Sequence, residues 1–97
     1  SVFKNSRKKD ISFIKGFNQG QSMTIRRFEQ LFHRYQLSKI DCVGKVLDPE
    51  TMIAVETGSV KNIEKGMVLE ELRAGFLYQN QVLRLAEVKV NRIDKGL

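Results

Sequence analysis

Apolar side chains recur at helical spacing through the first third of the chain. When successive residues are turned by about 100°, these positions fall within about 60° of one line, away from the intervening arginines. They are Phe13, Ile14, Phe17, Thr24, Ile25, Phe28, Leu31, Phe32 and Tyr35. The pattern predicts one amphipathic helix from Ile11 to Gln36, with Asp10 as its N-cap and residues 1–9 frayed before it. The alternative is two shorter helices broken near Gly20, because glycine inside a helix costs about 1 kcal/mol relative to alanine.

From residue 40 onward the apolar residues come in short runs separated by turn residues. Such runs, bounded by Gly, Pro, Asn and Asp, are typical of β-strands. The expected strands are Ile40–Val43, Met52–Glu56, Met67–Arg73, Phe76–Tyr78 and one or two within Gln81–Asn91. The stretch from Val68 to Val90 reads as a β-meander that presents a surface. The sequence therefore predicts an α+β fold, with a helical arm over residues 1–38 and a β-wing domain of about six short strands over residues 39–97.

The aromatic residues of the predicted helix have no other helix in the chain to pack against. An exposed apolar stripe of this size marks an interaction site, so either a second chain or the β-strands must bury it. If a second chain buries it, the dimer interface consists of Phe13, Ile14, Phe17, Ile25, Phe28, Leu31, Phe32 and Tyr35.

The chain has 97 residues and a net charge of +6, which is concentrated in its first part. Residues 1–40 carry a balance of +7, and residues 41–97 carry −1. A basic segment of this kind suits nucleic acid, an acidic protein partner, or simply a solvated helix face. Nucleic acid is the weaker expectation, because aromatic residues that stack on bases interleave with basic ones, whereas here they line the apolar face.

Cys42 is the single cysteine, so neither an internal disulfide nor a cysteine-based zinc site can form, and a reducing compartment such as the cytoplasm is expected. No apolar run approaches the roughly 20 residues that span a membrane, so no membrane association is expected. The first ten residues lack the apolar core of a signal peptide. The start at Ser1, without Met, suggests a fragment of a longer chain.

The sequence offers no set of residues for catalysis. His33 is the only histidine, and it falls on the polar side of the helix without the further ligands that a metal site needs. Glu70 and Glu71 are neighbours, so on a strand their carboxylates point to opposite faces and do not form an acid/base pair. The glycines never form a phosphate-binding loop. We therefore predict a protein that is not an enzyme and that needs no metal and no cofactor.

Several short motifs, taken in order, resemble one known family. They are Leu47-Asp48-Pro49, Gly66-Met67-Val68-Leu69, Gly75-Phe76 and Val82-Leu83-Arg84-Leu85-Ala86-Glu87-Val88-Lys89-Val90. Together with the helical segment Gly20–Leu37, they resemble the C-terminal half of GrpE, the nucleotide exchange factor of the bacterial chaperone DnaK. No single motif is diagnostic, but their order and spacing over residues 11–92 make a specific signal.

The resemblance implies a homodimer that binds the ATPase domain of DnaK through its β-wing and promotes the release of ADP. Carried over onto this sequence, the contact positions are Leu47, Asp48, Pro49, Leu72, Gln81 and Val90. For Leu72 and Val90 the alternative is a place in the β core. The chain departs from the family's pattern where Met52 replaces a common His, Phe76 a Tyr, and Gln81 a basic residue. Two alternative functions are a basic nucleic-acid-binding module and a dimerisation module without exchange activity.

Overall fold

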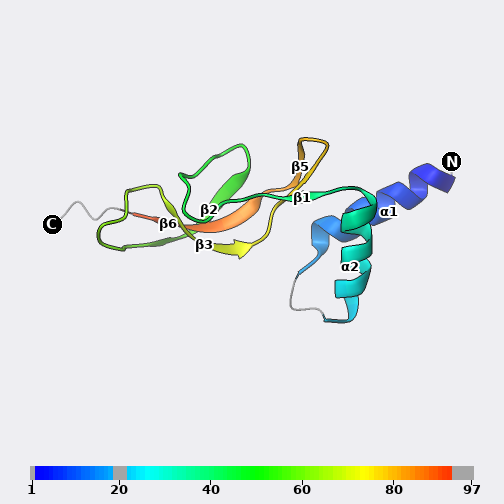
Figure 1. Ribbon diagram of the computed structural model, residues 1–97, viewed down its shortest axis with the longest axis horizontal. Coiled ribbons are helices and arrows are strands. Elements are labelled where there is room, and N and C mark those ends of the chain that lie inside the picture. Colours follow the sequence, from blue (N-terminus) through cyan, green and yellow to red (C-terminus); the bar gives the residue numbers. More distant parts are fainter. Residues whose placement is uncertain (1, 19–21, 93–97) are drawn as a thin grey trace.

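Two helices, not one, form the N-terminal part of the structure. In the computed structural model, which describes residues 2–18 and 22–92, α1 spans Val2–Gly16 and α2 spans Ser22–Arg34 (Figure 1). The continuous helix from Ile11 to Gln36 is therefore wrong, and the alternative of two helices is confirmed, although Gly20 itself lies outside the described residues. Neither α1 nor α2 is long and apolar enough to cross a membrane.

The chain folds back between the helices because aromatic residues find partners within the same chain. The rings of Phe17 and Phe28 stack with their centroids 4.0 Å apart, whereas in one straight helix the two residues would lie about 16 Å apart along the axis. Asp10 lies inside α1, so it is not an N-cap, and residues 2–9 are helical rather than frayed. Its buried carboxylate accepts hydrogen bonds from Tyr35 Oη at 2.6 Å and from Arg27 Nη2 at 3.1 Å, and these bonds tie α1 to α2.

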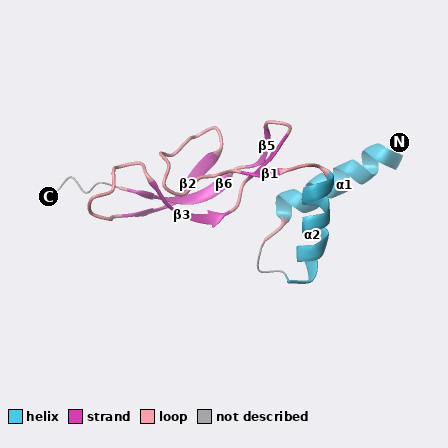
Figure 2. Ribbon diagram, viewed as in Figure 1, coloured by secondary structure: helices cyan, strands magenta, loops and turns pink. Residues whose placement is uncertain are grey.

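Six short strands follow the helices within the described residues (Figure 2). They are β1 Ser38–Lys39, β2 Met52–Gly58, β3 Val68–Arg73, β4 Phe76–Tyr78, β5 Gln81–Arg84 and β6 Ala86–Asn91. The strand expected over Ile40–Val43 is wrong. That segment is irregular because its hydrogen bonds run to separate places: the N–H of Ile40 donates to the Gly75 carbonyl, and the N–H of Gly44 donates to the Val68 carbonyl, both at 3.0 Å. The α+β class itself is confirmed.

The strands form two small sheets, each with three strands. In the proximal sheet the order is β1-β4-β5, and in the distal sheet it is β2-β6-β3, with β6 parallel to β2 and antiparallel to β3. The expected meander is therefore only partly right, since β4 and β5 form a hairpin but β6 leaves that sheet and inserts between β2 and β3. Gly75 permits this crossing, because a Cβ there would overlap the backbone nitrogen of Ala86 and lie 2.7 Å from the Arg84 carbonyl oxygen.

Two apolar clusters hold these elements together. The distal cluster lies under the distal sheet and contains the buried residues Ile40, Cys42, Met52, Val68, Ala86 and Val88. The aromatic cluster joins both helices to the proximal sheet and contains Ile14, Leu31, Leu37, Ala74 and Phe76, with Phe13, Phe28, Phe32, Tyr35, Tyr78 and Leu83 packed against them. The molecule is elongated, 59 × 27 × 17 Å, with the helices at one end and the distal sheet toward the other (Figure 1). The aromatic cluster has members on both sides of residue 38, and the domain boundary proposed there stays a prediction.

Candidate docking surface

The loop before β2 takes its shape from Asp48. Its carboxylate accepts a hydrogen bond from the Glu50 N–H at 3.0 Å, and its carbonyl accepts from the N–H groups of Thr51 at 3.1 Å and Met52 at 2.8 Å. Side chains of this type stabilise turns by bonding to the backbone two residues on, and the following proline fixes its own φ. Asp48 is half-buried, and Pro49 is exposed. The turn therefore presents Pro49 at a defined place before β2.

Leu47 and Val90 pack against the same distal cluster from different elements. The N–H of Leu47 donates to the Gly66 carbonyl at 2.9 Å, which places the loop beside the start of β3, and Val90 pairs with Val68 at that same end. Both side chains are half-buried, so each supports the core and also reaches the surface. The structure thus brings these two predicted contact positions to one place.

Leu72 and Gln81 lie on other elements. Leu72 is on the edge strand β3 with 39% of its surface exposed, which places it on the surface rather than in the β core. Gln81 begins β5 directly after Gln79 and Asn80, whose φ angles are 50° and 65°. Positive φ at both positions is typical of the type I′ turns that close β-hairpins. Gln81 is therefore exposed at a hairpin tip of the proximal sheet, whereas Leu72 belongs to the distal sheet.

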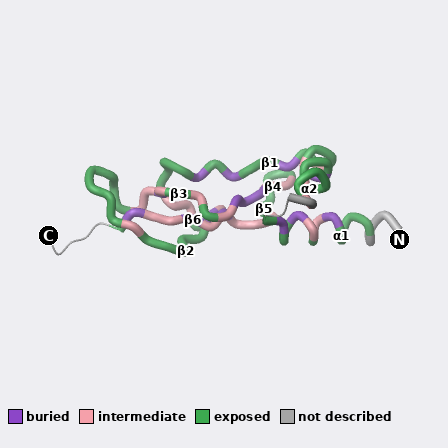
Figure 3. Tube along the Cα trace, turned by 90° about the horizontal axis from the view of Figure 1, so that it is seen from below, coloured by how far each residue is buried: buried purple, intermediate pink, exposed green. Residues whose placement is uncertain are grey.

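The structure also exposes aliphatic side chains that sequence reasoning did not single out. They are Val43, Val46, Ile53, Val55, Val60, Ile63 and Val82. Ile53 and Val55 are the clearest case, because among the described strands β2 pairs with β6 alone, and β2 is exposed over nearly its whole length (Figure 3). The sequence pattern identifies this strand, but its place at the sheet edge depends on strands far along the chain. With Leu72 on the opposite edge strand β3, these exposed aliphatic side chains make the distal sheet the candidate interaction surface.

The predicted dimer interface is divided between the interior and the surface of one chain. Three members are buried within the chain itself: Ile14, Phe17 and Leu31. Four are half-buried: Phe13, Phe28, Phe32 and Tyr35. Phe28 and Phe32 pack on the ring of Phe76, with centroids 5.1 and 6.0 Å away, so a strand buries part of the stripe. Ile25 is exposed, and the contact of this stripe with a second chain stays a prediction.

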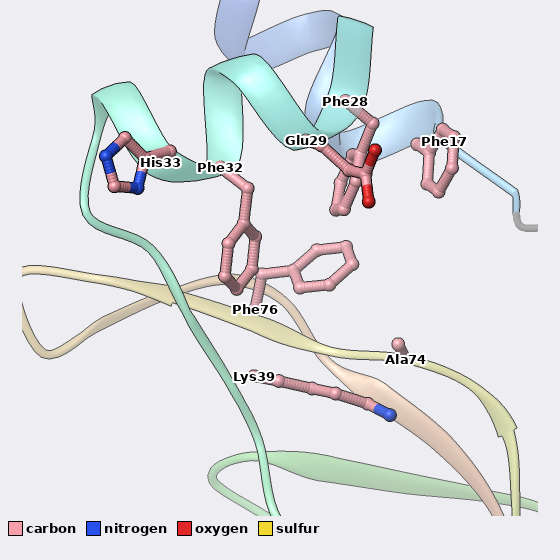
Figure 4. A pocket seen from close by; sticks show the side chains of 8 residues that line it. All are labelled: Phe17, Phe28, Glu29, Phe32, His33, Lys39, Ala74 and Phe76. Carbon is pink, nitrogen blue, oxygen red and sulfur yellow. The ribbon is translucent and has the colours of Figure 1, made fainter. Parts of the chain in front are cut away.

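A cleft of about 340 Å³ lies between α2 and the proximal sheet (Figure 4). Its walls are apolar, and its polar side chains are Glu29, His33 and Lys39; the apolar lining consists of Phe17, Phe28, Phe32, Ala74 and Phe76. His33 is exposed, and the described residues contain no group of three His, Cys, Asp or Glu side chains that could hold a metal ion. The cleft is thus an apolar recess with charged groups beside it.

Cys42 is buried in the distal cluster beside a carboxylate. Its Sγ lies 3.5 Å from Glu71 Oε1, and the other oxygen of Glu71 pairs with Lys39 Nζ at 2.9 Å. Burial raises the pKa of the Cys42 thiol above its ordinary value of 9.0, and the neighbouring Glu71 charge raises it further. Because the thiolate is the nucleophilic form, this cysteine is a poor nucleophile at neutral pH and fits a packing role.

Comparison with known proteins identifies the family. The family model named GrpE matches residues 2–92. The chain is 32% identical over 83 residues to Protein GrpE of Brevibacillus choshinensis, covering 86% of this chain and 46% of that protein. It is 35% identical over 77 residues to Protein GrpE of Rhizorhabdus wittichii, covering 79% of this chain and 42% of that protein. The chain thus spans less than half the length of these relatives. Since the matched residues include both helices and both sheets, the chain belongs to the GrpE family.

Proposed function

We propose that this chain carries the docking surface of a GrpE-type co-chaperone that promotes ADP release from a DnaK-type chaperone in the cytoplasm. The β-strands bind the chaperone's ATPase domain more tightly when its nucleotide cleft is open, which shifts the population toward the open state. By linkage, bound nucleotide weakens the complex by the same factor. The observation that carries this proposal is the family match over residues 2–92, which includes every described strand.

The exposed aliphatic side chains around the distal sheet support a docking role. In protein interfaces a few apolar anchors carry most of the binding energy, and truncating one costs about 2 kcal/mol or more. The proposed contacts are Leu47, Asp48, Pro49, Leu72, Gln81 and Val90. Leu72 is the best of them for a mutational test, because its exposed side chain can be shortened with little loss of core packing. Leu47 and Val90 also support the distal cluster, so their removal would mix binding with stability.

A homodimer is the second part of the proposal. Ile25 is exposed on α2, and the half-buried rings of Phe28 and Phe32 follow on the same helix. A second copy that covers this face would bury what the strands leave open. Sedimentation of the unmodified chain, called the parent below, should then show a dimer. Ile25→Glu should shift the equilibrium toward the monomer. An unchanged dimer in this variant would place the interface elsewhere.

The release of a fluorescent ADP analogue from the cognate DnaK-type chaperone tests the exchange activity. Adding this chain should accelerate release, and Leu72→Ala should weaken its binding to the ATPase domain about thirtyfold, since about 2 kcal/mol corresponds to that factor at about 1.4 kcal/mol per tenfold. Gln30→Ala is the control, because Gln30 is exposed on α2, away from the strands, and is not among the proposed contacts. No acceleration by the folded parent would refute the exchange activity and leave a dimerisation module, and equal weakening by both variants would remove Leu72 from the site.

One observation favours a second candidate function, nucleic-acid binding. Arg7, Lys8 and Lys15 line one side of α1 around Ile11 and Ser12, and none of these three cations forms an ion pair with an acidic residue in the described ranges. Nucleic acid bound there would release counterions, so its affinity would fall steeply with salt. A gel shift with mixed-sequence RNA and DNA at low and physiological salt decides: a salt-sensitive shift that Lys8→Gln weakens supports this function, and no shift excludes it.

A further inference from the structure

Two arginines reach from the strands to the C-terminal end of α1. Arg84 ends β5 and Arg73 ends β3, so they come from different sheets. Arg84 Nη1 donates to the carbonyl of Lys15 at 3.1 Å and to that of Phe17 at 2.5 Å. Arg73 Nη2 donates to the same Lys15 carbonyl at 3.3 Å, and its Nε donates to Asn18 Oδ1 at 3.0 Å. Arg73 and Arg84 are named the arginine clamp below.

Each guanidinium of the arginine clamp also contacts residues in the β part of the chain. Arg84 Nε donates to the Ala74 carbonyl at 2.8 Å, and its guanidinium carbon lies 4.5 Å from the ring centroid of Phe76, a cation–π contact. Arg73 Nη1 donates to Glu87 Oε2 of β6 at 3.3 Å. Because each guanidinium contacts the end of α1 as well as the strands, the two arginines connect α1 to both sheets.

The end of a helix is a suitable place for such a contact. The last four carbonyls of an α-helix have no partner within the helix, and together they carry a partial negative charge. The planar fork of arginine can serve several carbonyls at once, which the single ammonium of lysine cannot do with the same geometry. Burial lowers the pKa of Arg84, and the nearby Arg73 charge lowers it further, yet an arginine stays protonated in proteins. The carbonyls therefore offset the cost of bringing two cations together.

We infer that the arginine clamp sets the orientation of the distal sheet relative to the helices, so that Arg73 and Arg84 are positioning residues for the docking surface. The aromatic cluster ties the helices to the proximal sheet. The distal sheet is joined to α1 through Arg73, and its central strand β6 follows directly after Arg84 and Leu85. Loss of the clamp would leave both sheets folded but would allow the distal sheet to move relative to α1.

The functional consequence rests on the proposed function. A docking surface held at one angle can fit the open state of the ATPase domain better than the closed state. A surface that moves freely can follow either state, so it loses the difference in affinity that shifts the population. Loss of the clamp should therefore lower the greatest acceleration of ADP release while the ATPase domain still binds.

A distance measurement between two spin labels tests the orientation directly. The labels are attached at Ser12→Cys on α1 and Lys61→Cys beyond β2, both at exposed positions, while buried Cys42 with its raised pKa reacts slowly. Mixing the labelled chain with an excess of unlabelled chain suppresses the distances between labels on different copies. The parent should give one narrow distance, and Arg84→Gln and Arg73→Gln should each lose it in favour of a broad distribution.

Two controls separate the clamp from the loss of a charge or of an ion pair. Arg92→Gln removes an exposed arginine directly after β6 of the distal sheet, and Lys45→Gln removes an exposed ion pair with Asp41 that lies outside the clamp. Both controls should keep the narrow distance. Arg84→Lys, which keeps the charge but not the fork, should fall between the parent and Arg84→Gln.

The outcomes distinguish this inference from the proposed function. A narrow distance in both glutamine variants would overturn the inference, whatever the exchange activity. A broad distance with full acceleration of ADP release would overturn the positioning role. A parent without exchange activity would contradict the proposed function but would leave the distance result standing. If Arg84→Gln does not fold, Arg73→Gln decides, because the Arg73 side chain lies at the surface with 32% exposed.

Discussion

The aromatic cluster and the distal sheet differ in how far each buries its apolar side chains. In the aromatic cluster, rings from α2 and β4 face one another within a single chain, as Phe28 and Phe76 show, and Phe17, directly after α1, stacks on Phe28. Around the distal sheet, Ile53, Val55 and Leu72 remain exposed although the strands are well paired. In the first region, apolar side chains from the helices and the proximal sheet cover one another at least in part, so this region acts as a frame. The second leaves aliphatic side chains exposed, which is compatible with the docking role proposed above.

The largest expected effect on stability lies in the frame. Phe76→Ala should lower the free energy of unfolding by about 4 kcal/mol, because it removes a buried ring from the centre of the aromatic cluster. Val55→Ala on the exposed face of β2 should change it by less than about 0.5 kcal/mol. Urea unfolding followed by circular dichroism measures both. Similar losses in the two variants would contradict the contrast between the two regions.

Gly75→Ala tests the crossing between the two sheets. The added methyl group would meet the backbone of Ala86 and Arg84 and the Cδ1 of Ile40, so the free energy of unfolding should fall by about 3 kcal/mol. Gly16→Ala is the control, because nothing lies within 4 Å of its Cβ and a helical alanine stabilises by up to about 1 kcal/mol. A tolerated Gly75→Ala would mean that β6 can move away from the bend without loss.

Asp10→Ala tests the polar link between the helices. The substitution leaves the Tyr35 hydroxyl without its acceptor at 2.6 Å, so the free energy of unfolding should fall by about 2 kcal/mol. Asp41→Ala removes an exposed ion pair with Lys45 at 3.0 Å and should cost less than about 0.5 kcal/mol. Thermal unfolding monitored at a helical wavelength compares the two variants. Equal shifts would show that burial of Asp10 adds nothing.

The smallest expected effect is the pH dependence of the stability that the hydrogen bond between Tyr35 and Asp10 provides. The hydrogen bond to the Asp10 carboxylate raises the pKa of Tyr35 above its ordinary value of 10.0, and burial and the Asp10 charge raise it further. A raised pKa in the folded state means that this stabilisation is complete below pH 10.0 and is lost as the pH rises through the folded value. Stability measured across this range should fall less in Tyr35→Phe than in the parent. An identical fall would show that Tyr35 is not its source.

Features that depend on neighbouring residues could be predicted from the sequence. The bounds of β4 at Phe76–Tyr78 and the turn at Gln79 and Asn80 are confirmed, because a short apolar run and a hairpin turn are set by local backbone preferences. The amphipathic stripe is also local, since it depends only on the period of the helix. The family motifs belong to the same class, because they are read in order along the chain, and the match over residues 2–92 confirms them.

Features that depend on distant partners were decided by the tertiary structure. The helix breaks because Phe17 can stack on Phe28, and Asp10 changes from a helix cap to a buried link because Tyr35 and Arg27 come within reach. The same holds for β6 between β2 and β3, and for Arg73 and Arg84 at the end of α1. The spacing of apolar residues along the sequence indicates which face of an element is apolar. Which partner covers that face depends on the free energies of all the long-range contacts together, and these exist only in the folded chain.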